Sequence, residues 1–154
     1  MNATDFLDLA REWLDVAGDD LAFAELGLLN GPFMQTCFQC QQVSEKALKA
    51  YLFAQHQPLI RTHELPRLRV VCEGFDQDFE VLEEACDILN VYYIDTRYPE
   101  VLRSHERYTA EVAQEAYGLA TDVLSFVRER TAILLSTEAP DEPRDEAAGG
   151  TDEE

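Results

Sequence analysis

The sequence predicts an all-α protein: an up-and-down antiparallel four-helix bundle with one short extra helix and a disordered acidic tail. Three observations predict this fold. Apolar residues recur at alternating spacings of three and four along most of the chain, which is the periodicity of an amphipathic helix. No segment shows the strict alternation of apolar and polar residues that marks a strand. Turn-forming residues separate the periodic segments, so that successive helices can pack antiparallel.

The first helix is expected from about residue 5 to residue 29, with Thr4 as its N-cap. Its apolar seam has spacings of three and four: Leu7, Ala10, Leu14, Ala17, Leu21, Ala24 and Leu28. Such a seam faces the interior of a bundle. The run Asn30-Gly31-Pro32 ends the helix, because glycine accepts the left-handed conformation and proline cannot continue a helix.

The second helix is expected from about residue 33 to residue 55. One side is apolar: Phe33, Cys37, Cys40, Ala47, Tyr51 and Ala54. Another side is polar: Gln42, Glu45, Lys46 and Lys49. The polar residues are three and four positions apart, so they are neighbours in space on one edge of the helix.

Three further helices complete the predicted bundle, over about residues 62–72, 78–94 and 109–135. Thr62 can cap the first of them, which is short and has Pro66 near its start. Residues 137–154 show no periodicity and hold eight acidic residues against one arginine, so we expect a disordered tail. The predicted domains are therefore a helical bundle over 1–136 and an acidic tail over 137–154.

The composition makes this a strongly acidic protein, with 31 acidic against 12 basic residues and a net charge of −19. Such a charge repels nucleic acid at long range, so an RNA-binding surface needs a local group of basic residues. The chain lacks both a run of eighteen apolar residues and the basic and apolar regions of a secretory signal. We therefore expect a cytoplasmic protein without a membrane span.

The four cysteines are Cys37, Cys40, Cys72 and Cys86. They form one CxxC and two single positions, and no histidine pair stands at metal-ligand spacing, so we expect no metal site. Reduced cysteines packed in a helical core are the favoured interpretation. The sequence contains no glycine-rich phosphate loop and gives no reason to expect a cofactor.

The residues best suited to catalysis are Arg97, Arg103 and His105. Histidine can move a proton to or from a ribose hydroxyl, and arginine can hold the non-bridging oxygens of a phosphate as charge grows on them. An arginine–histidine pair is thus a minimal set of groups for RNA cleavage without a metal ion. Exposed arginines flanked by Glu100 and Glu106 are also typical of a solvated, salt-bridged surface.

Three blocks of the chain resemble the HEPN family (higher eukaryotes and prokaryotes nucleotide-binding). They are Phe38-Gln39-Cys40-Gln41-Gln42-Val43-Ser44-Glu45-Lys46-Ala47-Leu48-Lys49-Ala50, Thr62-His63-Glu64-Leu65 and Tyr93-Ile94-Asp95-Thr96-Arg97-Tyr98-Pro99. The resemblance implies a helical bundle that is often a homodimer. It also implies a partner, a minimal nucleotidyltransferase, in a two-component or toxin–antitoxin pair. Many members are ribonucleases whose arginine is followed, after four to six residues, by histidine.

The chain departs from that ribonuclease spacing, because seven residues separate Arg97 from His105. We therefore expect a dimeric HEPN protein that binds a nucleotidyltransferase and has an RNA- or nucleotide-related role. A metal-independent endoribonuclease using Arg97, Arg103 and His105 is the first alternative. A nucleotide-binding module, with phosphate held by Lys46, Lys49, Arg97 and His63, is the second. The basic residues that could build a positive groove are Lys46, Lys49, Arg61, Arg67, Arg69, Arg97, Arg103 and Arg107.

Overall fold

The computed structural model describes residues 1–97 and 104–137, and of Arg97, Ser104 and His105 it describes the backbone alone. The α-helices are α1 (Ala3–Leu26), α2 (Phe33–Ala54), α3 (Leu65–Glu73), α4 (Glu83–Asn90), α5 (Tyr92–Arg97) and α6 (Ala110–Thr137). Two short 3-10 helices are η1 (Gln77–Leu82) and η2 (Ser104–Arg107). Across these described residues there is no strand, and the predicted all-α fold is confirmed.

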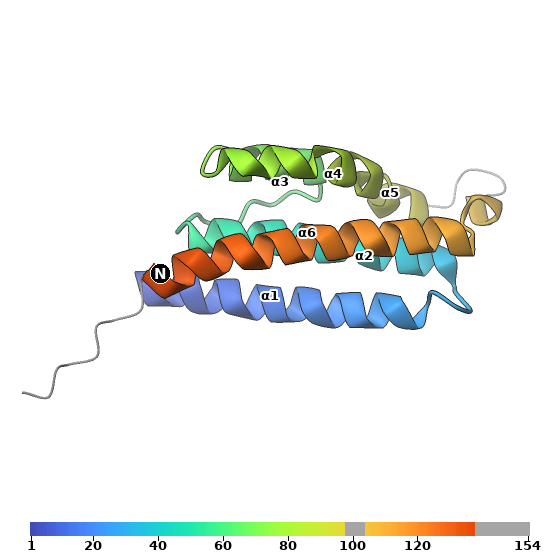
Figure 1. The fold of residues 1–154 in the computed structure, drawn as a ribbon, viewed down its shortest axis with the longest axis horizontal. Helices are drawn as coiled ribbons and strands as arrows, with labels where there is room; N and C mark the ends of the chain where they lie inside the picture. The colour runs from blue at the N-terminus through green and yellow to red at the C-terminus, as the bar shows by residue number, and fades with distance from the viewer. Residues whose placement is uncertain (98–103, 138–154) are drawn as a thin grey trace, which may run out of the picture.

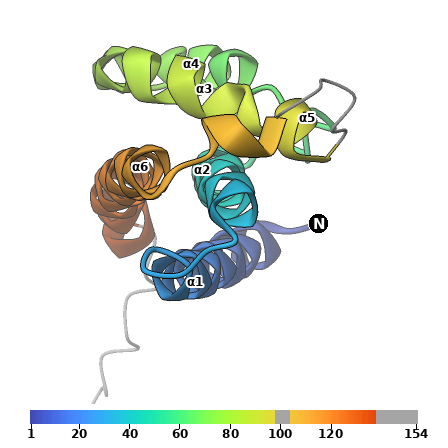
Figure 2. The ribbon, with the colours of Figure 1, turned by 90° about the vertical axis from the view of Figure 1, so that its right-hand side faces the viewer.

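Helix α2 runs through the centre of the molecule, between α1, α6 and the layer formed by α3, α4 and α5 (Figures 1 and 2). Helices α1 and α4 run opposite to α2 and α6, so the predicted antiparallel arrangement is confirmed (Figure 1). The seam of α1 points inward as expected, with Leu7, Ala10 and Leu14 among its buried residues. Neighbours on every side make α2 the most buried helix, and even its polar Gln41, Glu45 and Lys49 are buried.

The N-terminus of α1 is capped by Asn2, so the expectation of Thr4 as N-cap was wrong. The Asn2 side chain accepts a hydrogen bond from the Asp5 N–H at 2.9 Å, and the Asp5 carboxylate accepts one from the Asn2 N–H at 3.0 Å. This reciprocal capping box satisfies two backbone donors that would otherwise lack a partner. The helix therefore begins at Ala3.

The segment predicted as one helix over 78–94 is divided into η1, α4 and α5. Asp76 caps η1 by accepting from the Asp78 N–H at 3.0 Å. Residue 91 separates α4 from α5, and the Asn90 side chain before it accepts from the Leu65 N–H at 2.9 Å. This hydrogen bond of Asn90 ties the end of α4 to the start of α3.

The short helix begins at Leu65 rather than near Thr62. The Thr62 hydroxyl accepts a hydrogen bond from the Glu64 N–H at 3.2 Å, which stabilises a turn instead of a helix start. Pro66 then occupies the first turn of α3, where its missing N–H has no consequence. The loop before α3 is therefore fixed by its own side chains.

All four cysteines are buried and unpaired, as the sequence predicted. Burial raises the pKa of the Cys37, Cys40 and Cys86 thiols to about 12, so they stay protonated and unreactive at neutral pH. In the part of the chain that the structure describes, no helix is long and apolar enough to span a bilayer. The tail predicted over 137–154 lies outside the described residues except for Thr137, which ends α6.

Candidate functional site

The two lysines predicted to bind phosphate both contact carboxylates. Lys46 donates a hydrogen bond to Asp20 of α1. The Lys49 ammonium lies 3.1 Å from Glu45 Oε2 and 6.0 Å from the centre of the Trp13 ring. The side chains of Glu45 and Lys49 are each only 7% exposed. Both lysines thus hold α2 in the bundle, and neither presents an unpaired charge to a ligand.

His63 lies at the junction of α2, α5 and the loop before α3. Its Nδ1 donates to Glu45 Oε1 at 2.9 Å, since an ionised carboxylate can only accept. Its ring stacks on Tyr93, with 4.1 Å between ring centres and 12° between planes. Gln41 donates to the His63 carbonyl at 3.0 Å. The ring is therefore held in one orientation, while the side chain stays 53% exposed.

This histidine borders a hollow of about 440 Å³ that we call the His63 pocket. Its walls come from the loop before α3, the first turn of α3, the end of α4 and α5. The lining residues are Arg61, Thr62, His63, Glu64, Arg67, Asn90, Tyr93 and Ile94. The hydrogen bonds of Thr62 and Asn90 to the backbone hold these walls together.

The arginines of this pocket differ from the other cations of the chain. Among cationic side chains that the structure describes, only Arg61, Arg67 and Arg128 lie beyond ion-pair distance of every described carboxylate. The cations that do form ion pairs are Arg11, Lys46, Lys49, Arg69, Arg107 and Arg130. Arg61 and Arg67 are both exposed and both line the His63 pocket. Two unpaired guanidinium groups at one hollow suit an anionic ligand.

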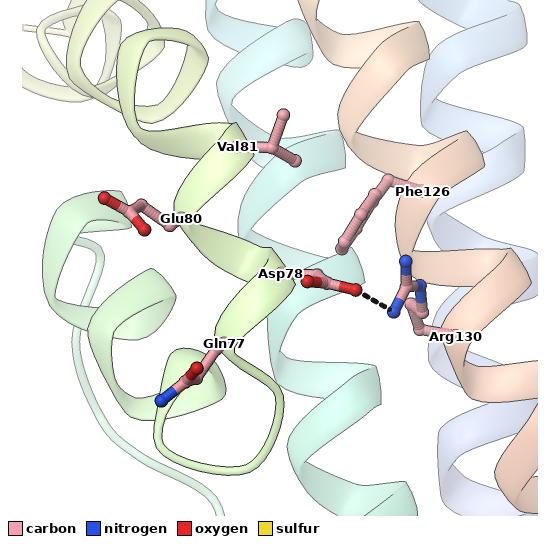
Figure 3. Close-up of a pocket in the computed structure, with 6 residues that line it drawn as sticks. All are labelled: Gln77, Asp78, Glu80, Val81, Phe126 and Arg130. Atoms are coloured by element: carbon pink, nitrogen blue, oxygen red, sulfur yellow. Dashed lines mark hydrogen bonds and ion pairs between the residues drawn. The ribbon is translucent and has the colours of Figure 1, made fainter.

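A larger hollow of about 610 Å³ lies between η1 and α6, and we call it the Arg130 pocket (Figure 3). The Arg130 guanidinium is 2.8 Å from Asp78 and 3.1 Å from Asp76, and it lies 4.9 Å from the centre of the Phe126 ring. The hydrogen bond to Asp78 is the main reason that the pKa of Arg130 is raised. This arginine is neutralised, so the larger hollow does not suit a phosphate.

The structure does not describe the side chains that were predicted to be catalytic. The backbone of Arg97 ends α5, one turn beyond Tyr93 of the His63 pocket. The backbone of His105 lies in η2, and Arg103 lies outside the described residues. Their catalytic role therefore stays a prediction, as does phosphate binding by Arg97.

A half-buried hydrogen bond ties the residues just before α6 to α5. The Tyr108 hydroxyl donates to Asp95 Oδ2 at 2.6 Å, and the Tyr108 ring meets Tyr92 edge-on at 5.9 Å. Burial raises the pKa of Tyr92 to about 12, and burial together with Asp95 raises the pKa of Tyr108. Both phenols stay protonated at neutral pH. The contact fixes the two ends of the segment that carries the predicted catalytic residues.

The sequence predicted His63 as a phosphate-binding residue, whereas Arg61 and Arg67 were predicted only as two of eight basic residues that could build a positive groove. The sequence feature that could have identified these two arginines is their position, two residues before and four residues after His63. Over residues 1–97 and 104–137, no group of three or more His, Cys, Asp or Glu residues gathers closely enough to hold a metal ion.

The chain belongs to the HEPN domain family, whose model matches residues 10–130. The crystal structure of TT1696 from Thermus thermophilus is similar, with a TM-score of 0.72 and 37% sequence identity. The crystal structure of ST0689, an archaeal HEPN homologue, is also similar, with a TM-score of 0.65 and 26% identity. Each match covers 79% of this chain and 97% of the other. A comparison with curated proteins found no match.

Proposed function

We propose that this HEPN-domain protein binds the phosphate of a nucleotide or of an RNA strand in the His63 pocket. The observation that carries the proposal is the pair of exposed guanidinium groups, Arg61 and Arg67, without a described carboxylate partner. In a chain of net charge −19, cations near carboxylates are the rule. A pair left without one is suited to an external anion, since arginine binds phosphate through two parallel hydrogen bonds.

Two further features of the pocket support a nucleotide rather than a bare anion. The N-terminus of α3 contributes Arg67 in its first turn, and the positive end of a helix dipole favours a phosphate there. His63 is stacked on Tyr93, so the outer face of its ring can stack on a base. The carboxylate of Glu64 and the amide of Asn90 line the same hollow and offer polar contacts to a base edge.

Calorimetry with ATP tests the proposal. We expect binding by the native protein, and at least a tenfold weaker affinity after Arg61→Ala combined with Arg67→Ala, because each charge-assisted bond contributes about 1.5–3 kcal/mol. Arg128→Ala is the matched control, since Arg128 is exposed on α6 and also has no described ion-pair partner. Absence of heat at millimolar ATP, together with absence of binding to a short single-stranded RNA, would overturn the proposal.

A second candidate function is that of a homodimeric partner of a minimal nucleotidyltransferase. It is favoured by an apolar patch at the turn between α1 and α2, where Phe23, Leu26 and Leu29 are 62%, 78% and 86% exposed. The patch borders a hollow of about 430 Å³ whose lining has no charged side chain. Exposed apolar patches of this kind mark protein interfaces.

The test of this candidate is the mass in solution and co-purification with a nucleotidyltransferase encoded beside the chain. We expect a dimer, and dissociation to a monomer or loss of the partner after Phe23→Asp or Leu26→Asp. Val91→Asp, at a 55% exposed valine on another surface, is the control. A monomer that binds no nucleotidyltransferase would contradict the candidate.

The endoribonuclease alternative has its own test. Cleavage of RNA in the presence of EDTA, lost after His105→Ala, is the result expected of a metal-independent nuclease. The backbone of Arg97, one turn beyond the His63 pocket, favours keeping this alternative. Equal cleavage by the native and His105→Ala proteins would reject the assignment.

A further inference from the structure

The Arg130 pocket combines an apolar floor with an acidic rim. Val81 of η1 is 71% exposed, and Phe126 of α6 lies across the hollow from it (Figure 3). Ile133, one turn beyond Arg130 on α6, is 56% exposed. Exposed apolar side chains such as Val81 are unfavourable in water unless a partner covers them.

The charge of this hollow is negative. The only cation of its described lining is Arg130, which is shared between Asp76 and Asp78 and rests on Phe126. Glu80 on the rim is exposed and lies beyond ion-pair distance of every described cation. Neutralising Arg130 therefore leaves a surplus of carboxylate on the η1 side.

We infer that the Arg130 pocket docks an amphipathic helix of a partner protein, one whose apolar side chains cover Val81 and Phe126 and whose lysine or arginine residues face Glu80 and Asp78. Charge complementarity selects this occupant, since a negative rim steers and retains a cationic partner. Apolar anchors three and four residues apart are the usual means by which a helix fills such a groove. The inference is independent of the phosphate proposed for the His63 pocket.

A second copy of this chain is a poorer occupant. The described cations without a carboxylate partner are Arg61, Arg67 and Arg128, and they lie beside the start of α3 and on α6 rather than along one apolar helix face.

The test uses a labelled amphipathic peptide of about 14 residues, four helical turns, with leucine on one face and lysine on the other. Its anisotropy is measured with the full-length protein at about 0.15 M KCl. We expect Val81→Asn and Glu80→Lys each to weaken binding by at least about fivefold, the loss of one good contact. The controls Val91→Asn and Glu12→Lys make the same chemical changes at exposed positions elsewhere and should alter binding less than about twofold.

Each other outcome overturns the inference. No peptide binding by the native protein removes the docking site. If Glu80→Lys and Glu12→Lys weaken peptide binding equally, the cationic peptide is attracted to the acidic protein as a whole rather than to this pocket. A change of oligomeric state in Val81→Asn means that a second copy occupies the surface. Circular dichroism of the two pocket variants verifies that the helices remain folded.

Discussion

The lysines of α2 and the arginines beside α3 carry the same charge, but the lysines are paired with carboxylates and the arginines are not. Lys46 and Lys49 lie against Asp20 and Glu45, and Lys49 is almost completely buried. Arg61 and Arg67 are exposed at the His63 pocket without a described carboxylate within reach. The first pair stabilises the packing of α2, whereas the second pair contributes little to the fold and remains available to a ligand. A phosphate site is therefore indicated by the availability of its cations rather than by their number.

The largest expected effect is at the buried ion pair. Lys49→Met should lower the free energy of unfolding by roughly 3–5 kcal/mol, because it leaves the Glu45 carboxylate buried without its cation. Urea denaturation measures the loss. The double variant Glu45→Gln, Lys49→Met should recover most of it, since no buried charge is then unpaired. A loss below about 1 kcal/mol, typical of exposed pairs, would show that Lys49 is not committed to the fold.

A smaller effect is expected at Tyr108. Tyr108→Phe removes the hydrogen bond to Asp95 but keeps the packed ring, so we expect a loss of about 1.5 kcal/mol. The measurement is again urea denaturation, with Tyr117→Phe as the control, because Tyr117 is only partly buried. An unchanged stability would mean that this bond does not fix α5 to the start of α6.

Thr131 tests the effect of an unpartnered polar group inside the bundle. Its hydroxyl is buried and lacks a hydrogen-bond partner among the described residues. Thr131→Val keeps the shape and removes the hydroxyl, so we expect a gain of about 1 kcal/mol in stability. A shift of the thermal midpoint to a lower temperature would contradict this expectation. A polar group without a partner is thus costly when it is buried, like the Thr131 hydroxyl, and costs little when it is exposed to water, like Arg61 and Arg67.

The smallest effect on stability is expected at the pocket itself. Arg67→Ala should change the free energy of unfolding by less than about 0.5 kcal/mol, as for other exposed residues without partners. Urea denaturation of Arg67→Ala beside Lys49→Met gives the contrast in one experiment. Similar losses of unfolding free energy in both variants would mean that Arg67 stabilises the fold as much as Lys49 does, which contradicts the comparison.

Sequence periodicity was sufficient for the bundle and insufficient for its breaks. The apolar residues of α1 face inward as predicted, because a spacing of three and four reports which face of a helix is buried. Phe79, Leu82, Cys86 and Leu89 are buried as well. Their spacing continues across the boundary between η1 and α4, so it could not reveal that the helix is divided. Periodicity reports the buried face, whereas the break after α4 coincides with a tertiary hydrogen bond, in which the Asn90 side chain accepts from the Leu65 N–H.

The candidate site was predicted in part for a related reason. Glu45 stands four residues before Lys49, a pairing visible in the sequence. Asp20, the partner of Lys46, comes from α1 and is known only once the helices are packed. Arg61 and Arg67 flank His63 in the sequence, but their lack of partners is a property of the folded chain.

The most direct test of the central claim is the salt dependence of binding to a short single-stranded RNA. Each phosphate contact contributes about 0.7 to the slope of log K against log salt concentration. We predict that Arg61→Ala and Arg67→Ala each reduce the magnitude of the slope by about 0.7, and that Arg128→Ala leaves it unchanged. Slopes that are equal in all three variants and the native protein would contradict the account.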